Sequence, residues 1–450
     1  MKLYSENEQY KLYQGNMLDM LEVIEKESID SIVTDPPYEL NFMAKSWDNS
    51  GIAFQSDTWK KCYEVLKPGG YLLAFGGSRT FHRIACAIED AGFEIRDTIM
   101  WLYGSGFPKS MNIGLAIDKK NNVDNRTGNI VKGMASNNTE SLNNHKYESQ
   151  NFKKKYEERI AQNKWQGWGT ALKPSFEPII VARKPFKGSL VDNVIEYGVG
   201  GINIDECRVG TNEKITNHSR SEASANNHIF KNKAQITHQT EGQQQGRFPA
   251  NTILTYDETD FDEVCGGFPD TKTGNIKPYK RNMKNQTCYG NLGENVTSNH
   301  IGDSGSASRY FYCAKASKKD RDEGLDTFIE EKVNDGRNTP IDNAFQRGET
   351  LRKNTHPTVK PTELMQYLVR LVSPNVATIL DPFNGSGSTG KAVMYENKER
   401  NKNYKYIGIE LTEEYLPIAK ARIEYVCNLI EENKTKDKQM SIFDIGESDE

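Results

Sequence analysis

Residues 376–390 read VATILDPFNGSGSTG, and this stretch decides the fold. The apolar run 376–381 predicts a buried strand, because it is short and ends at a proline. A G-x-G-x-x-G turn follows at 385–390, before a predicted helix, and glycines there let the backbone turn tightly and approach a ligand. Glu410, at the end of the next predicted strand, 404–410, can accept hydrogen bonds from ribose hydroxyls.

The glycine pattern taken alone also fits a nicotinamide-dependent dehydrogenase. The position of the pattern argues against that enzyme. A nucleotide-binding unit that starts near residue 376 has room for only two strands in the given sequence. The sheet must therefore be completed by strands from the N-terminal part of the chain. In addition, Asp381 and Phe383 have no evident use beneath a pyrophosphate, whereas they suit a cofactor with an amino group and an apolar arm.

A second motif, Asp35-Pro36-Pro37-Tyr38, ends the apolar run 29–34, which predicts another buried strand. The exocyclic amine of a nucleobase is a poor nucleophile, because its nitrogen is conjugated with the ring. A carboxylate and a main-chain carbonyl held rigid by proline can both accept its N–H bonds as it attacks a sulfonium methyl group. The aromatic ring offers a stacking surface for a base taken out of the helix. A rigid turn without chemistry is the alternative interpretation of this motif alone.

Together the two motifs resemble the S-adenosylmethionine-dependent DNA amino-methyltransferases of the permuted (beta) group, with stretches similar to phage and prophage adenine-N6 enzymes. In that group the Asp-Pro-Pro-Tyr half comes first, a target-recognition region follows, and the cofactor half with Asp-Pro-Phe-x-Gly-Ser-Gly comes last. This chain has the same order, and its segment His356-Pro357-Thr358-Val359-Lys360-Pro361 also matches the family. The resemblance covers residues 10–118, 165–185 and 355–426.

The resemblance implies roles for the residues at matching positions. The expected catalytic residues are Asp35, Pro36, Pro37 and Tyr38. Asp19 matches the acidic position that faces the adenine of the cofactor, and Glu410 matches the one that binds its ribose. The residues expected to bind S-adenosylmethionine are Asp19, His356, Thr358, Lys360, Asp381, Pro382, Phe383, Gly385, Gly387, Ser388 and Glu410. No metal is expected, because methyl transfer from a sulfonium needs none.

The implied reaction is site-specific transfer of a methyl group to the N6 amine of a flipped adenine in duplex DNA, since Asp at the first motif position leans toward adenine in the family. Cytosine-N4 methylation by the same machinery stays open, as does an RNA or protein amino-methyltransferase. A DNA-binding module without catalysis is the alternative from another class. C5-cytosine methylation is set aside, because the catalytic cysteine of that family follows a proline and none of the seven cysteines here does.

The expected fold is α/β, a Rossmann-like, doubly wound and mostly parallel sheet built from both chain ends, with an inserted target-recognition region. Residues 1–185 form the catalytic half, in which 119–164, rich in Asn, Lys, Gly and Ser, is a flexible insertion. The remaining parts are the recognition region 186–350, the cofactor-binding half 351–430 and a disordered tail 431–450.

The middle region is expected to bind double-stranded DNA. Between residues 264 and 319, nine Lys and Arg stand against three Asp and Glu, with aromatic residues between them. Basic side chains follow phosphates, and aromatic rings can stack on bases. The alternative is a solvated surface beside ordinary core aromatics. The residues singled out for DNA contact are Lys280, Arg281, Lys318 and Lys319.

Composition sets outer limits on these interpretations. The 450 residues carry 58 Lys and Arg and 62 Asp and Glu, for a net charge of −4, which excludes a wholly basic DNA-coating protein. No stretch approaches the roughly 20 apolar residues of a membrane span, and the N-terminus lacks an apolar signal core. We therefore expect no membrane contact and a cytoplasmic protein in a bacterial or phage-infected cell.

The charged tail contains an apolar cluster, Gln439-Met440-Ser441-Ile442-Phe443. It resembles the pentapeptide with which bacterial proteins bind the replication sliding clamp, so that clamp is a candidate partner. The alternative is that Ile442 and Phe443 pack against the protein's own surface.

Overall fold

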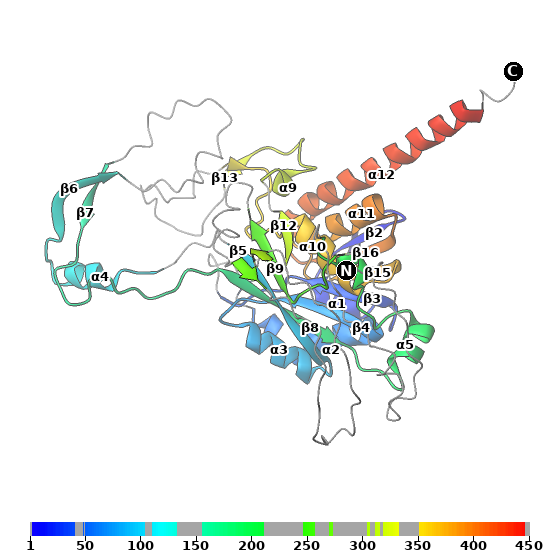
Figure 1. The fold of residues 1–450 in the computed structure, drawn as a ribbon, viewed down its shortest axis with the longest axis horizontal. Helices are drawn as coiled ribbons and strands as arrows, with labels where there is room; N and C mark the ends of the chain where they lie inside the picture. The colour runs from blue at the N-terminus through cyan, green and yellow to red at the C-terminus, as the bar shows by residue number, and fades with distance from the viewer. Residues whose placement is uncertain are drawn as a thin grey trace, which may run out of the picture.

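The computed structural model describes residues 2–40, 48, 50–103, 110–132, 155–210, 246–256, 270–272, 304–306, 311–315, 318–332 and 351–445 (Figure 1). Its centre is a ten-stranded sheet with the order β1-β2-β16-β15-β3-β4-β8-β5-β9-β12. The strands are, in chain order, β1 (Lys2–Glu6), β2 (Tyr10–Gln14), β3 (Ile29–Thr34), β4 (Leu66–Phe75), β5 (Glu94–Tyr103), β8 (Phe176–Arg183), β9 (Thr252–Tyr256), β12 (Tyr312–Lys315), β15 (Val376–Asp381) and β16 (Asn403–Glu410).

The five strands from β2 to β4 in this order run parallel to one another. The C-terminal strands β15 and β16 lie between β2 and β3 from the N-terminal part of the chain. The predicted doubly wound, mostly parallel sheet built from both chain ends is therefore confirmed. Beyond β4, strand β8 pairs antiparallel with both β4 and β5, while β9 and β12 continue the sheet parallel to β5.

Helices cover both faces of the sheet, because its central strands are apolar on both sides. All six residues of β3 are buried, and neighbours such as Ile32 and Val33 enter the cores on opposite faces. One face is covered by α1 (Met17–Leu21), α2 (Ser56–Val65) and α3 (Phe81–Asp90). The other is covered by α10 (Thr362–Val372), α11 (Ser388–Arg400) and α12 (Leu416–Ile445).

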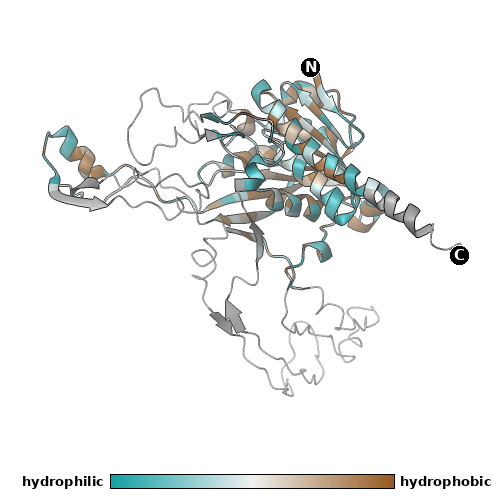
Figure 2. Ribbon diagram, turned by 90° about the horizontal axis from the view of Figure 1, so that it is seen from above, coloured by the Kyte–Doolittle hydropathy of each residue, from teal (hydrophilic) through white to brown (hydrophobic). Residues whose placement is uncertain are grey.

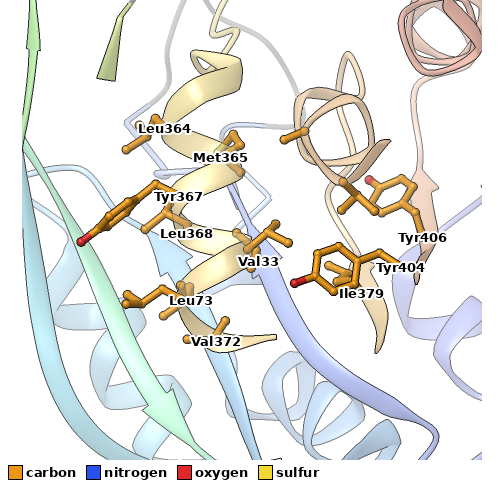
Figure 3. Close-up of a cluster of buried hydrophobic side chains, with 14 of the residues drawn as sticks. Val33, Leu73, Leu364, Met365, Tyr367, Leu368, Val372, Ile379, Tyr404 and Tyr406 are labelled. Carbon is orange, nitrogen blue, oxygen red and sulfur yellow. The ribbon is translucent and has the colours of Figure 1, made fainter. Parts of the chain in front are cut away.

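Helix α10 anchors the second face. Its side chains Leu364, Met365, Tyr367, Leu368 and Val372 lie against residues of four parallel strands, Val33, Leu73, Ile379, Tyr404 and Tyr406 (Figure 3). Leu364 and Leu368 are fully buried, and burial of one such side chain contributes about 1.5–3 kcal/mol. This packing joins the C-terminal strands to the N-terminal ones and so fixes the two motifs side by side.

The region 186–350, predicted to be the inserted recognition region, also contributes strands to this sheet. Strands β9 and β12 extend it beyond β5, and the Tyr312 ring stacks on Tyr367 of α10 with 4.1 Å between centroids. The local apolar runs at these strands are too short to reveal their place in the sheet. The remaining elements of this part are α5 (Leu190–Tyr197), α9 (Lys318–Asp322), β10 (Asp270–Lys272), β11 (Ser304–Ser306), β13 (Glu331–Lys332) and β14 (Leu351–Arg352).

The predicted flexible insertion 119–164 contains regular structure in its described parts. Helix α4 (Ile113–Lys120) is followed by the antiparallel strands β6 (Arg126–Lys132) and β7 (Lys155–Arg159). Both views place this unit well away from the sheet, at the left edge of Figures 1 and 2. The polar segment therefore contains regular structure in a projecting unit, and its flexibility stays a prediction.

The last helix is longer than the sequence predicted. A short 3-10 turn at Glu413–Tyr415 leads into α12, which continues to Ile445 through most of the predicted disordered tail. The charged segment 431–438 has few strong helix breakers, so it can prolong the helix that begins on the core. None of the described helices is long and apolar enough to cross a membrane.

Candidate active site

A cleft of about 1920 Å³ opens at the carboxyl ends of the parallel strands. The chain passes from β15 through α11 to β16 in one direction and from β3 through α2 to β4 in the other, so the connections diverge between β15 and β3. Ligands in open α/β sheets bind at such a point of divergence. Both sequence motifs meet here, because residues 35–38 follow β3 and residues 381–386 end and follow β15.

Asp35 has one engaged and one unengaged carboxylate oxygen. Its Oδ2 accepts a hydrogen bond of 2.5 Å from Lys360 Nζ. Its Oδ1 is buried and has no hydrogen-bond donor in the described part of the chain. Burial raises the pKa of Asp35, with the Lys360 ammonium opposing the rise and Glu177 adding to it. A buried acceptor without a partner is costly, so an oxygen of this kind marks a functional group.

Two residues that the sequence analysis missed complete this side of the cleft. The Tyr38 hydroxyl donates to Glu177 Oε2 at 2.7 Å, and the Tyr103 hydroxyl donates to Glu177 Oε1 at 3.3 Å. Glu177 lies at the start of β8, whose antiparallel direction brings its amino end to the cleft. An acidic residue directly before the apolar run PIIVA of this strand was the one available signal.

Lys360, predicted to bind the cofactor, lies beside Asp35 on the side of the cleft that follows β3. Besides its bond to Asp35, its ammonium is 3.6 Å from Glu177 Oε2 and 5.3 Å from the centre of the Tyr38 ring. Burial lowers the pKa of Lys360, but the two carboxylates outweigh burial and raise it overall, so the ammonium stays charged. Lys360 and Asp35 are 325 residues apart in the chain, so the sequence alone could not predict that they form a pair.

Asp381 is buried at the end of β15, and every bond it makes is internal to the fold. Its Oδ1 accepts from the Thr34 hydroxyl at 2.6 Å and from the Phe383 N–H at 3.0 Å, and its Oδ2 accepts from the Thr389 hydroxyl at 2.6 Å. Burial raises the pKa of Asp381 to about 6, although these donors lower it. Asp381 lines the cleft as predicted, but its carboxylate also holds the turn in place.

Glu410 ends β16 in the position that the prediction gave it. Its Oε2 accepts from the Gly385 N–H and its Oε1 from the Thr412 N–H, each at 2.7 Å, and burial raises its pKa against these bonds. Gly385 has φ of +52°, and a Cβ there would come within 2.9 Å of His356 Nε2. The glycine therefore permits a close approach of the loop to His356.

Gly387 has a packing role that differs from its predicted one. Its φ is +75°, and a Cβ there would meet the Cα of Ala419 in α12 at 2.9 Å. The missing side chain at this position is therefore required by the packing of α12, and the predicted contact of Gly387 with the cofactor stays a prediction. Ser388 lines the cleft, and its hydroxyl receives a bond of 3.1 Å from the buried Arg422.

The other predicted cofactor residues divide into two groups. Pro382, Phe383, His356 and Thr358 line the cleft, and the His356 ring packs at 4.5 Å, centroid to centroid, against Tyr415. Asp19 instead lies exposed in the first turn of α1, while the cleft wall at that strand end is formed by 15–17.

Of the four residues singled out for DNA contact, Lys280 and Arg281 lie outside the described residues. Lys318 and Lys319 begin α9, and Lys319 is exposed. The next residue, Asp320, ties α9 to the cofactor half, because it accepts a bond of 2.8 Å from the Thr362 N–H and one of 2.7 Å from Lys391.

The cleft fits a cofactor that has a ribose and a positively charged, phosphate-free arm. Glu410 presents a carboxylate at the end of β16, and Phe383 presents an apolar ring. The loop 381–390 has no Lys or Arg, and the adjacent Lys391 is buried in ion pairs with Asp320 and Glu323. A phosphate group of a ligand would find no cation in this loop. A ligand amino group would find the carboxylates of Asp35, Asp381 and Glu410 in the cleft. Among the described residues there is no cluster of His, Cys, Asp and Glu that could hold a metal ion.

A family model described as DNA methylase, N6_N4_Mtase, matches residues 29–421. The chain therefore belongs to this DNA methylase family. The match includes both strand-end motifs and all of the cleft residues that follow β3, β15 and β16.

Two curated relatives are Type II methyltransferases. M.HindIII of Haemophilus influenzae is 25% identical over 220 residues, which are 48% of this chain and 53% of that protein. M.HpaI of Haemophilus parainfluenzae is 33% identical over 106 residues, 22% of this chain and 34% of that protein. The chain thus spans about half and about a third of the length of these two relatives.

Among solved structures, the cytosine-N4-specific PvuII DNA methyltransferase matches with a TM-score of 0.39 and 12% identity over 94% of this chain and 92% of that one. The complex of M1.HpyAVI with SAM matches with a TM-score of 0.35 and 13% identity over 92% of this chain and 100% of that one.

Proposed function

We propose that this protein transfers a methyl group from S-adenosylmethionine to the exocyclic N6 amine of an adenine in duplex DNA. The observation that carries the proposal is the buried Asp35 Oδ1, an acceptor without a donor in the described chain, in a cleft shared with the loop 381–390. Asp at the first position of the motif supports adenine over cytosine. Such a substrate places the activity in the cytoplasm of a bacterial or phage-infected cell.

The residues around Asp35 prepare it for an amine. Lys360 binds Oδ2 and fixes the carboxylate, which leaves Oδ1 to accept one N–H of the target. The carbonyl of Pro36, held by the adjoining prolines, offers a second acceptor. Tyr38, bonded to Glu177, presents its ring as a stacking surface for the flipped base.

The cofactor, when bound, supplies an electrophilic methyl group on a sulfonium. Glu410 would bind its ribose, and Phe383 would contact its apolar part. Asp35 Oδ1 would accept one N–H of the amine and so orient its nitrogen, and it would be available to accept the proton that the amine loses after the transfer. Most of the rate gain is expected from orientation and from acceptors already in place.

The test is direct. The full chain is incubated with S-adenosylmethionine carrying a deuterated methyl group and unmodified genomic DNA, and the digested nucleosides are analysed by mass spectrometry. The expected product is deuterated N6-methyladenosine in the deoxy series. Labelled N4-methylcytosine instead would favour the cytosine alternative. No labelled nucleoside, under conditions where calorimetry shows that the cofactor binds, would contradict the proposed substrate.

We further propose a bacterial sliding clamp as a partner of Gln439–Phe443, from the resemblance of that segment to a clamp-binding pentapeptide. Since α12 continues to Ile445, the segment would have to leave the helix to bind in extended form. Binding of a peptide of residues 436–446 to a purified clamp tests this, and its absence at high clamp concentration would contradict it.

A further inference from the structure

The projecting unit beside the cleft, defined here as the arm, consists of residues 110–132 and 155–175. Figures 1 and 2 show its helix and hairpin standing apart from the sheet in two views. Its base returns to the sheet directly before β8. Residues 110–111 and 170–175 at this base line the same cleft as Asp35. The arm is therefore continuous with the proposed active site.

Apolar side chains are concentrated on the arm near the cleft. Leu172 is 93% exposed, Trp168 58%, Met111 56% and Trp165 37%. Single exposed apolar residues are ordinary on a protein surface, but Trp165, Trp168 and Leu172 lie within eight residues of one another, and such a group is typical of a binding surface. Leu172 is itself among the residues that line the cleft, so this group reaches the cleft mouth.

The arm is basic, in contrast to the chain as a whole. Its described residues include eight Lys and Arg against four Asp and Glu, whereas the whole chain has a net charge of −4. Two of the acids are already engaged, since Asp118 accepts bonds from the Gln162 N–H and from Asn163, and Asp124 forms an ion pair of 3.0 Å with Arg126 of the same arm. Lys164 and Lys173 are exposed on the two sides of the tryptophans. This excess of positive charge is complementary to a phosphate backbone.

The base of the arm is held in a defined conformation. The hydroxyl of Ser110 accepts bonds from the N–H groups of Thr170 and Ala171 at 2.9 and 3.2 Å. In return, the Met111 N–H donates to the Thr170 hydroxyl at 3.0 Å. These bonds join the two chain segments of the base immediately before Leu172. The exposed leucine thus follows a braced segment, which suits a side chain that enters a gap.

We propose that the arm contacts duplex DNA, that Lys164 and Lys173 bind phosphates, and that Leu172 fills the space left in the duplex by the flipped target base. The proposal rests on the proposed function. Taking a base out of the stack costs a few kcal/mol, and an apolar side chain in the vacated space offsets part of that cost. Without Leu172, methylation of a paired target base should therefore become slower, whereas methylation of a base that is already unpaired should change little.

The first experiment compares Leu172→Ala with the wild type in the full chain, after the modified sequence has been mapped with wild-type protein. Methylation is measured on duplexes with a paired or a mismatched target base. We expect a 10- to 100-fold loss on the paired duplex, less than a threefold loss on the mismatched one, and unchanged cofactor affinity. The control is Val376→Ala, a 68% exposed residue at the amino end of β15, away from the cleft.

Equal rates of Leu172→Ala and wild type on the paired duplex would overturn the filling role, and so would equal losses on both duplexes. Wild-type protein without activity on any DNA would instead refute the proposed function, and this inference with it. Activity in the wild type together with unaffected variants would refute this inference alone.

A second experiment tests the phosphate contacts. The double variant Lys164→Glu, Lys173→Glu should bind DNA more weakly and lower the slope of log affinity against log salt by about 2. The matched control is Lys26→Glu, Lys60→Glu, two exposed lysines outside the cleft lining. An unchanged affinity and slope in the arm variant would overturn the DNA contact and leave a protein partner as the occupant of this surface.

Discussion

Two Asp-Pro turns lie next to each other at the ends of β3 and β15, and they differ in what surrounds the aspartate. The Asp381 carboxylate receives three neutral donors, from Thr34, Phe383 and Thr389. The Asp35 carboxylate receives the Lys360 cation on one oxygen and no donor on the other within the described chain. The same dipeptide at the same kind of strand end is thus satisfied in one case and left incomplete in the other.

Under the proposed function, this difference distinguishes an aspartate that supports the fold from one that contacts the substrate. Hydroxyl donors satisfy a carboxylate and fix the backbone around it, as at Asp381, which also receives Thr34 from the neighbouring strand. A cation on one oxygen orients the carboxylate and leaves the other oxygen for a substrate, as at Asp35. Because Thr34 immediately precedes Asp35, the supporting turn also positions the chemical one.

The largest effect is expected for Asp35→Ala. Removal of the acceptor for the target amine should lower the methylation rate by about 10³-fold, because the interaction is strongest in the transition state. Cofactor affinity by calorimetry should change little. Asp57→Ala, an exposed carboxylate on α2, serves as the control. Turnover by Asp35→Ala near the wild-type rate would remove the distinction between the two aspartates.

Asp381→Asn should alter the pH dependence of stability. The folded-state pKa of Asp381 is about 6, above the ordinary value of 3.8, so the folded protein keeps a proton that the unfolded chain has lost. The stability from this group is present below its ordinary pKa and is lost as the pH rises through 6. Asparagine does not titrate. Between pH 4.5 and pH 7, the stability of the variant relative to the wild type should therefore rise by about 2 kcal/mol.

Urea unfolding at several pH values measures this gain, with Asp57→Asn as the control for a carboxylate on the surface. A difference between Asp381→Asn and wild type that stays constant with pH would show that Asp381 titrates normally. Its role would then resemble that of an exposed carboxylate, and the contrast with Asp35 would rest on hydrogen bonds alone.

The local signals in the sequence located both turns, but they did not reveal their partners. Strands β3 and β15 were predicted at their observed bounds, because each is an apolar run that ends at a proline. The pairing of Lys360 with Asp35, and the presence of Glu177 beside them, depend on contacts between distant segments. A glycine pattern also does not tell which neighbour requires the missing side chain, and at Gly387 the structure shows that the helix α12 is one such neighbour.

The structured arm was missed for a related reason. Its polar composition is typical of a flexible segment, and its order depends on specific bonds such as those of Asp118 and Ser110. From composition alone, these residues are simply hydrophilic. In the structure, their side chains form the hydrogen bonds that hold the arm together. Strands β9 and β12 were also not predicted. Their sequences are short, and they form strands because they pair with the edge of the sheet at β5.

The smallest effect is expected for Tyr38→Phe, which makes the aromatic ring of the first turn chemically equal to Phe383 of the second. Phe383 packs with its ring centroid 6.3 Å from that of Trp59 and needs no hydrogen bond, whereas the Tyr38 hydroxyl binds Glu177. If stacking on the base is the main contribution of Tyr38, the phenylalanine variant keeps it and loses one hydrogen bond. That loss is about 1 kcal/mol, or roughly a fivefold lower methylation rate. Tyr38→Ala should lose considerably more, and its rate in the same assay is the comparison. A Tyr38→Phe rate as low as that of Tyr38→Ala would show that the hydroxyl and its bond to Glu177, rather than the ring, distinguish the first turn from the second.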